Sequence, residues 1–245
     1  MKILQTILLS SLTTVAIADT TLTYTDNKDN VVMKMQFADN KMKATSVDDD
    51  STYMVYDANT TTFTTYMTDK KQYFVMGKEE IEALGDMSNM VNKILEKQLA
   101  DMPAEQREMM RGMLSSMIKA QMPKEMPKPE YSLTGKTASY NGFDCEVVKK
   151  KIQKKKSEFC VSTYKDVGMS ASEYAVITSF QHTIEGLAQQ VGHDSSMDFS
   201  SLGDYIPVKY KQAGKSGTLK SVNHDNLDLE IFAIPAGFSK MEMPF

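Results

Sequence analysis

Between residues 20 and 76, apolar and polar side chains alternate in short runs separated by turn-forming residues. Met33, Met35 and Phe37 occupy every second position, which is the period of a strand with one buried face. Asp39-Asn40 follows this run and provides turn chemistry. Similar runs recur at a spacing of roughly ten residues, so the pattern predicts six strands in an antiparallel meander.

The period changes to that of a helix over the segment 78–126. A first helix is predicted from apolar residues on one side of a helical wheel, which are Ile81, Leu84, Met87, Val91, Ile94, Leu95 and Leu99. Asp101 is a predicted N-cap, and Pro103 suits the first turn of a second helix. That second helix has a stripe rich in methionine, formed by Met109, Met110, Met113, Leu114 and Met117. The segment is therefore a two-helix insertion in a chain that otherwise favours strands.

Strand patterns return after this insertion. Asn141-Gly142 predicts a tight hairpin turn, and the capping box Ser170-Ala171-Ser172-Glu173 opens a helix that extends to about Val191. Strands are predicted at 131–140, 143–151, 155–163, 205–212, 217–224 and 227–234. The chain is thus predicted to be α+β, an antiparallel sheet with the two-helix insertion and one further helix packed over it.

Residues 1–18 have the pattern of a signal peptide. Lys2 precedes a largely apolar run, and Ala16-Ile17-Ala18 is a small-x-small cleavage signal. We expect cleavage after Ala18 and a single mature domain over 19–245. No Cys follows the cleavage point, so no lipobox is indicated, and no other stretch has the roughly 18 apolar residues of a membrane helix. The sequence predicts a soluble, periplasmic protein.

Charge and cysteine content narrow the function classes. The formal net charge is −4, which disfavours nucleic-acid binding because that function requires a basic face. Cys145 and Cys160 are the two cysteines, and we expect a structural disulfide of the kind found in oxidising compartments. Closing that loop of about 15 residues would stabilise the fold by about 3 kcal/mol. A redox pair favours a shorter spacing, and a zinc site would need further ligands.

Six short motifs follow one another along the chain. They are Met54-Val55-Tyr56-Asp57, Lys71-Gln72-Tyr73, Met102-Pro103-Ala104-Glu105-Gln106-Arg107-Glu108-Met109-Met110, Gly135-Lys136-Thr137, Asn141-Gly142-Phe143-Asp144-Cys145 and Ile234-Pro235-Ala236-Gly237-Phe238. In this order, the motifs resemble those of an exported bacterial family known as domain of unknown function 4412. The organisation of that family looks like that of the lipoprotein carriers LolA and LolB. The resemblance implies a curved, incomplete antiparallel barrel with helices over its open side, and it implies no catalytic residues.

Methionines form the first candidate site. Ten of the chain's twenty Met residues lie between residues 76 and 126, and Met suits surfaces that adapt to irregular apolar partners. A hydrophobic or lipid-like ligand is predicted to bind between the sheet and the methionine-rich helices, at Met33, Met35, Phe37, Met109, Met110, Met113 and Met117. Two alternatives stay open: a filled core with only a structural or interaction role, and thioether binding of Cu(I) or Ag(I).

Lysines form the second candidate site, at the tip of the hairpin that carries the cysteines. They are Lys149, Lys150, Lys151, Lys154, Lys155 and Lys156. A solvated tip is one interpretation, and contact with an anionic membrane surface is the other. A partner protein is not indicated by any motif.

No catalytic constellation emerges from the sequence. The chain lacks a Gly-x-Ser-x-Gly elbow, and its His-Asp dipeptides have no partner that would complete a triad. His182 and Glu185 share a helical face, but a third metal ligand is not visible. We therefore expect a non-catalytic protein without a cofactor or a resident metal.

Overall fold

The computed structural model describes residues 19–46, 51–85, 96, 99, 103–121, 127–190, 197–212 and 214–241. Twelve strands within these ranges form one largely antiparallel sheet, in the order β12-β6-β5-β4-β3-β2-β1-β11-β10-β9-β8-β7. The sheet is open, because β12 and β7 lie at opposite ends of this order. The predicted signal segment, 1–18, lies outside the described residues.

The predicted six-strand meander is confirmed. Its strands are β1 (Thr20–Thr25), β2 (Val31–Ala38), β3 (Lys41–Ser46), β4 (Thr52–Asp57), β5 (Thr62–Met67) and β6 (Gln72–Met76). Asp39 and Asn40 connect β2 to β3 with positive φ angles of 47° and 57°. These angles define the kind of two-residue turn whose twist matches that of a hairpin, which is why the Asp-Asn pair closes the strand at this point.

The second half of the sheet also contains the expected hairpins. Its strands are β7 (Glu130–Tyr140), β8 (Phe143–Ile152), β9 (Lys155–Thr163), β10 (Tyr205–Gln212) and β11 (Lys215–Asn223). Asn141 and Gly142 have φ angles of 51° and 85°, so the Asn-Gly turn forms as predicted. Cys145 on β8 and Cys160 on β9 form a disulfide with a Cα–Cα distance of 5.4 Å.

The two halves of the sheet meet at β1. On one side β1 pairs with β2, where Leu22 lies opposite Met35. On the other side it pairs with β11, where Leu22 lies opposite Val222. The first strand of the described chain is therefore an interior strand, and the junction joins segments about 200 positions apart.

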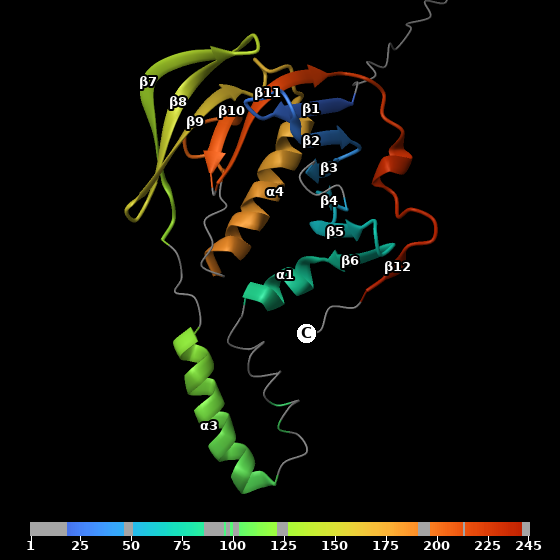
Figure 1. Cartoon of the computed structure of the whole chain (residues 1–245), viewed down its shortest axis with the longest axis vertical. Coiled ribbons are helices and arrows are strands. Elements are labelled where there is room, and N and C mark those ends of the chain that lie inside the picture. The colour runs from blue at the N-terminus through green and yellow to red at the C-terminus, as the bar shows by residue number, and fades with distance from the viewer. Residues whose placement is uncertain are drawn as a thin grey trace, which may run out of the picture.

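Helix α4 (Ala171–Gln190) crosses the face of the sheet between its two halves, β1 to β6 and β7 to β11, as Figure 1 shows. Val176 and Ile177 are buried on this helix, and Phe180 and Ile184 pack against the same core cluster. That cluster also includes Leu22, Met42 and residues of β8 to β11. Since these residues come from both halves of the sheet, α4 packs over the junction where the halves meet.

Two helices of the predicted insertion are present in the described residues. Helix α1 (Lys78–Gly85) follows β6 directly, and Ile81 on it packs against the main core. Helix α3 (Ala104–Gln121) follows Pro103 as expected and lies away from the sheet in Figure 1. The predicted N-cap, Asp101, lies outside the described residues.

The prediction of a last strand over 227–234 is wrong. The structure has a 3-10 helix, η2 (Leu229–Phe232), and a short strand β12 (Ser239–Lys240) that pairs in parallel with β6. The carboxylate of Asp228 accepts a hydrogen bond from the backbone N–H of Glu230. Such a local side-chain bond competes with strand pairing, and it caps the helical turn instead.

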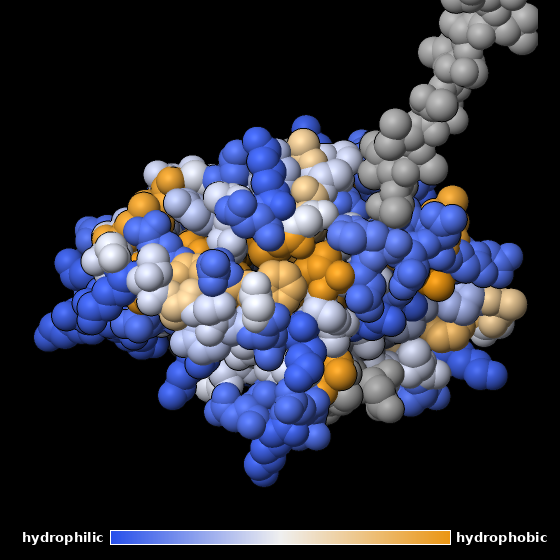
Figure 2. Space-filling model, turned by 90° about the horizontal axis from the view of Figure 1, so that it is seen from above, coloured by the Kyte–Doolittle hydropathy of each residue, from blue (hydrophilic) through white to orange (hydrophobic). Residues whose placement is uncertain are grey.

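The surface of the protein is mainly hydrophilic. Seen from above in Figure 2, apolar residues gather near the middle of the face and polar residues surround them. Within the described ranges, no helix is both long enough and apolar enough to span a membrane.

Candidate functional site

An apolar cavity of about 130 Å³ lies between α4 and the sheet. The sheet side of its wall includes Met33 and Met35 of β2 and Met42 and Ala44 of β3. The helix side includes Phe180 and Ile184 of α4, and Met197 closes part of the wall. Four methionine side chains thus line one apolar space beneath a single helix.

The alternation of the strands explains why these side chains meet. Met35 of β2 lies opposite Leu22 of β1 and Ala44 of β3 in the sheet. Tyr24 of β1 lies opposite Met33 in the same way. Residues that are directly opposite one another share a face of a sheet. These side chains of β1, β2 and β3 therefore form one apolar patch, and this patch faces α4.

The wall contains very few polar groups. The hydroxyl of Tyr24 donates a hydrogen bond of 2.8 Å to the backbone carbonyl of Pro207, and burial raises the pKa of this phenol well above its usual range. Tyr24 therefore presents its ring to the cavity while its polar group is already satisfied. Gln181 of α4 is the other polar side chain among the described residues of the wall.

The size of the cavity limits what it can hold. Its volume of about 130 Å³ is close to that of an apolar cavity of about 150 Å³ that stays dry and binds benzene. Pockets for drug-sized ligands begin at about 300 Å³. Without rearrangement, the cavity thus matches a ring or a short chain, and a longer acyl chain would require the methionines to repack.

Specific contacts hold α4 over the cavity. At its N-terminus, the hydroxyl of Ser170 accepts a hydrogen bond from the backbone N–H of Glu173 at 3.3 Å. In return, the carboxylate of Glu173 accepts the backbone N–H of Ser170 at 2.8 Å. This is the predicted capping box. It fixes the start of the helix beside the sheet.

Two further contacts lie along α4. The hydroxyls of Tyr56 and Ser179 are 2.7 Å apart, which joins β4 to the middle of the helix. His182 Nε2 lies 2.9 Å from Asp198 Oδ2, in the residue that follows Met197. The helix is therefore connected to the sheet on one side and to the 197–199 segment on the other.

The predicted ligand-binding residues are divided between three places. Met33 and Met35 line the cavity. Phe37, which is fully buried, instead lines a second and more polar hollow of about 200 Å³. The strand period correctly places Phe37 on the same face of the sheet as Met33 and Met35. Phe37 lies farther along β2, however, and it is not part of the cavity wall.

Met109, Met110 and Met113, the methionines of α3 whose side chains the structure describes, are not among the residues that line the cavity. Met109 and Met113 are 76% and 55% exposed, and Met110 is half-buried. Met117 lies in α3, but its side chain is outside what the structure describes. In the structure, α4 lies over the Met33–Met35 face, with Ile177, Phe180 and Ile184 in the cavity wall.

Five of the six lysines in the second predicted site are exposed at the β8–β9 hairpin. Lys150 differs, because it is only 1% exposed and its Nζ lies 5.9 Å from the ring centroid of Tyr131. Along β8, Val148 and Ile152 are also buried. The alternation Val148, Lys150, Ile152 was visible in the sequence and could have indicated that this lysine points inward.

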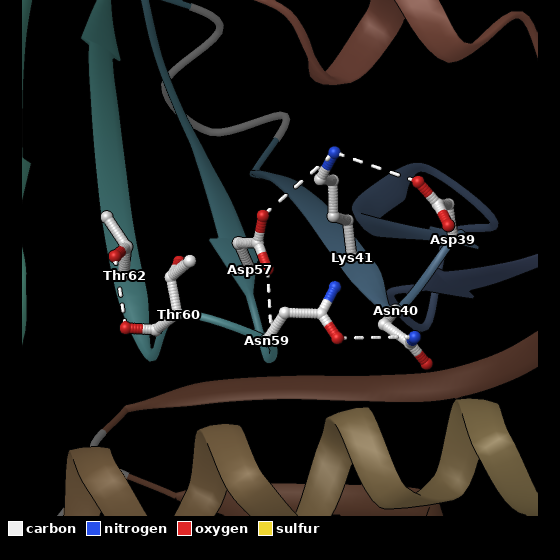
Figure 3. A network of polar contacts seen from close by, with 7 residues as sticks. All are labelled: Asp39, Asn40, Lys41, Asp57, Asn59, Thr60 and Thr62. Atoms are coloured by element: carbon white, nitrogen blue, oxygen red, sulfur yellow. Dashed lines mark hydrogen bonds and ion pairs between the residues drawn. The ribbon is translucent and has the colours of Figure 1, made fainter.

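The polar hollow beside Phe37 is lined in part by the β2–β3 turn, with Asp39, Asn40 and Lys41, and Figure 3 shows the contacts of this turn with the β4–β5 turn. Lys41 Nζ lies 3.9 Å from the carboxylate of Asp39 and 4.0 Å from that of Asp57. The Asn40 side-chain amide donates to Asn59 Oδ1 at 3.4 Å. These contacts join the β2–β3 turn to the β4–β5 turn, so the residues of the rim have a structural role.

The described residues offer weaker candidates for a metal site or for a second ligand-binding site. No group of three or more His, Cys, Asp or Glu side chains there could hold a metal ion. An open groove of about 600 Å³ lies beside the disulfide, with Asp144, Glu146 and Tyr205 among its lining residues. A molecule bound in this open groove would stay in contact with water, so the apolar cavity under α4, which is less open, is the stronger candidate.

Sequence reasoning missed several residues of the cavity. Leu22 and Met42 follow the strand alternation and could have been found from it. Gln181 and Met197 carried no local signal, since one is a polar residue of a helix and the other follows a polar loop. Their position depends on how α4 packs across the sheet.

Comparison with known proteins identifies no family. No family model matches the chain, and no curated protein matches it. Two crystal structures of a protein called PNGF-II, in space groups C2 and P21, align with 92% of the chain at 10% sequence identity, with TM-scores of 0.42 and 0.43. The chain spans about a third of the length of PNGF-II, 31% and 32% in the two cases. We draw nothing about function from a likeness of this size.

Proposed function

We propose that this protein is a non-catalytic binding protein for a hydrophobic or lipid-like ligand, which it holds between α4 and strands β1 to β3. The observation that carries the proposal is the cavity of about 130 Å³ lined by Met33, Met35, Met42 and Met197. Unbranched, polarisable methionine side chains adapt to ligands of irregular shape. A cavity with several of them can therefore enlarge at a small energetic cost.

The proposed setting is the bacterial periplasm, with a fold organised like that of the LolA and LolB carriers. The Cys145–Cys160 disulfide is consistent with an oxidising compartment, and the open sheet with a helix across its face is consistent with an incomplete barrel. The predicted cleavage after Ala18 would produce the exported chain. Membership of the family called domain of unknown function 4412 is part of the same proposal.

The binding proposal is tested with protein purified without detergent. Native mass spectrometry is expected to reveal an additional apolar mass or, for the empty protein, binding of an uncharged apolar fluorescent probe. Ala44→Leu fills part of the cavity wall and is expected to weaken probe binding at least tenfold. Ala175→Leu is the matched control, because Ala175 is an exposed residue of α4.

Two results would contradict the proposal. One is a protein that carries no apolar mass and binds no probe. The other is equal probe affinity in wild type, Ala44→Leu and Ala175→Leu, which would mean that the probe binds elsewhere. Either result would favour the alternative of a filled core with a purely structural role.

The second candidate function is binding of Cu(I) or Ag(I) by thioethers. The four methionines that line one cavity favour it, because soft metals select thioether ligands. Anaerobic titration with Cu(I) against a competing chelator tests this function. Metal affinity that survives Met33→Leu, Met35→Leu and Met42→Leu together would exclude the cavity as the metal site, since Leu preserves packing approximately.

A further inference from the structure

Gln181 is the exception in an otherwise apolar wall. It lies on α4 one turn after Ile177 and three residues before Ile184, and all three residues line the cavity. Its side-chain amide makes no hydrogen bond within the described part of the chain. An amide of this kind offers both a donor and an acceptor, so the wall contains one position where a polar group of a ligand can be satisfied.

The described residues that line the cavity include no charged side chain. The nearest carboxylate in sequence, that of Asp198 next to Met197, is only 8% exposed and lies 2.9 Å from His182 Nε2. A carboxylate on a ligand would therefore find no permanent cation in this wall.

Resting on the proposed function, we propose that the ligand is a neutral amphiphile, with an apolar body in the cavity and a hydroxyl or amide head that hydrogen-bonds to Gln181. A neutral head that forms this hydrogen bond avoids the cost of burying an unsatisfied polar group. An ionised carboxylate would lose its hydration without gaining a partner of opposite charge. Gln181 is then the residue that determines the class of ligand.

A cationic head does not fit equally well. The carboxylate of Asp198 already has partners, among them His182 Nε2 and the backbone N–H of Ser200 at 2.9 Å. An ammonium group would have to compete with His182 for this carboxylate. The neutral head requires no such exchange, because the amide of Gln181 has no hydrogen-bond partner among the described residues.

The test compares four small probes on the purified protein by NMR titration: benzene, 1-hexanol, hexanoate and hexylammonium. Benzene reports on the apolar cavity alone, since cavities of about this size bind it. We expect 1-hexanol to bind at least tenfold more tightly than hexanoate or hexylammonium at neutral pH. The six-carbon body is common to the last three probes, so their differences report on the head group.

Variants assign the preference to Gln181. Gln181→Leu keeps a similar volume and removes the amide, so the affinity for 1-hexanol relative to that for benzene is expected to fall about tenfold. Gln106→Leu is the matched control, because Gln106 is exposed on α3.

The outcomes separate the two proposals. If neither benzene nor 1-hexanol binds the wild type, the proposed function itself fails. If benzene binds but hexanoate or hexylammonium equals or exceeds 1-hexanol, the cavity binds ligands and the neutral head is wrong. If 1-hexanol affinity is the same in wild type and Gln181→Leu, Gln181 does not recognise the head.

Discussion

At the scale of single residues, burial separates methionines that the sequence cannot tell apart. Met42 on β3 is fully buried, and it lines the cavity under α4. Met109 on α3 is 76% exposed. Both residues lie in amphipathic patterns, but only the first is enclosed by neighbours. The contribution of a methionine to stability therefore depends on the element that covers it.

This difference predicts the effect of truncation. Met42→Ala is expected to lower the free energy of unfolding by about 2–5 kcal/mol, because it removes buried atoms and enlarges a cavity. The matched variant Met109→Ala is expected to change it by less than about 0.5 kcal/mol. Urea unfolding followed by circular dichroism measures both. Equal losses in the two variants would mean that the burial of Met42 does not contribute to stability.

Buried tyrosines predict a loss of stability at high pH. Burial, followed by the neighbouring Tyr53 and Tyr73, raises the pKa of Tyr66 from 10.0 to about 12. The folded state therefore favours the neutral phenol. Its contribution is complete below pH 10, and it is lost as the pH rises from 10 toward 12, because the unfolded chain releases the proton first.

Urea midpoints measured at intervals between pH 8 and pH 11.5 test this expectation. The wild-type midpoint should be nearly constant up to pH 10 and should then fall. Tyr66→Phe should show a shallower fall, since Phe has no proton to release. An identical pH profile in the variant would show that Tyr66 does not carry the effect.

The predictability of single residues depended on how local their signal was. The alternation of β2 was enough to place Met33 and Met35 on one face, and the cavity lies on that face. The charge of Lys150 predicts a place at the solvated tip, whereas its position midway between Val148 and Ile152, both buried, predicts an inward side chain. A buried lysine is rare, so composition and period gave opposite predictions there.

At the scale of elements, α4 rather than α3 covers the Met33–Met35 face. Its inward side has Val176, Ile177 and Phe180, which belong to or pack against the main core cluster. Exposed Arg107, Glu108 and Arg111 are spread along α3. The sequence predicted both helices, but which of them packs on the sheet is set by tertiary contacts that periodicity does not contain.

The capping box of α4 is expected to support the cover of the cavity. Ser170→Ala removes the hydroxyl that accepts the Glu173 N–H, and it should lower the free energy of unfolding by about 1 kcal/mol. Ser170→Thr retains a hydroxyl and should preserve most of that stability. Thermal or urea unfolding of the three proteins measures the difference, and equal losses in Ala and Thr would exclude the cap as the cause.

The error at 227–234 also arose at the scale of an element. Apolar and acidic residues alternate there as in a strand, but the Asp228 carboxylate caps a 3-10 turn. Phe232 then packs with Val55 and Tyr66, on a cluster separate from the main core. A strand period and a single turn of helix can both bury one aromatic residue, so the pattern alone did not decide between them.

At the scale of the whole molecule, the exposed lysines of the β8–β9 hairpin form a basic tip on an otherwise acidic chain. If the protein visits a membrane, this tip is expected to bind vesicles that contain phosphatidylglycerol, with a strength that falls as salt rises. Lysines close to such a surface contribute about 1 kcal/mol each. The combined variant Lys154→Gln, Lys155→Gln, Lys156→Gln should therefore bind on the order of 100-fold more weakly.

Co-sedimentation with vesicles measures this binding, and phosphatidylcholine vesicles provide the uncharged comparison. The matched control replaces three exposed lysines elsewhere, with Lys34→Gln, Lys70→Gln and Lys240→Gln. If both triple variants bind equally, general charge and not the hairpin is responsible. If the wild type does not bind the anionic vesicles, the tip is only a solvated turn.

The interior position of β1 has a consequence for the order in which the protein can fold. Strands β1 to β6 pair with their neighbours in sequence, so they can assemble soon after synthesis. The other edge of β1 remains unpaired until β11 has been made, because Leu22 pairs with Val222. The cavity wall also includes Ile206 of β10. A nascent chain therefore exposes its methionine face until nearly all of its sequence has been synthesised, and the binding cavity is among the last features to form.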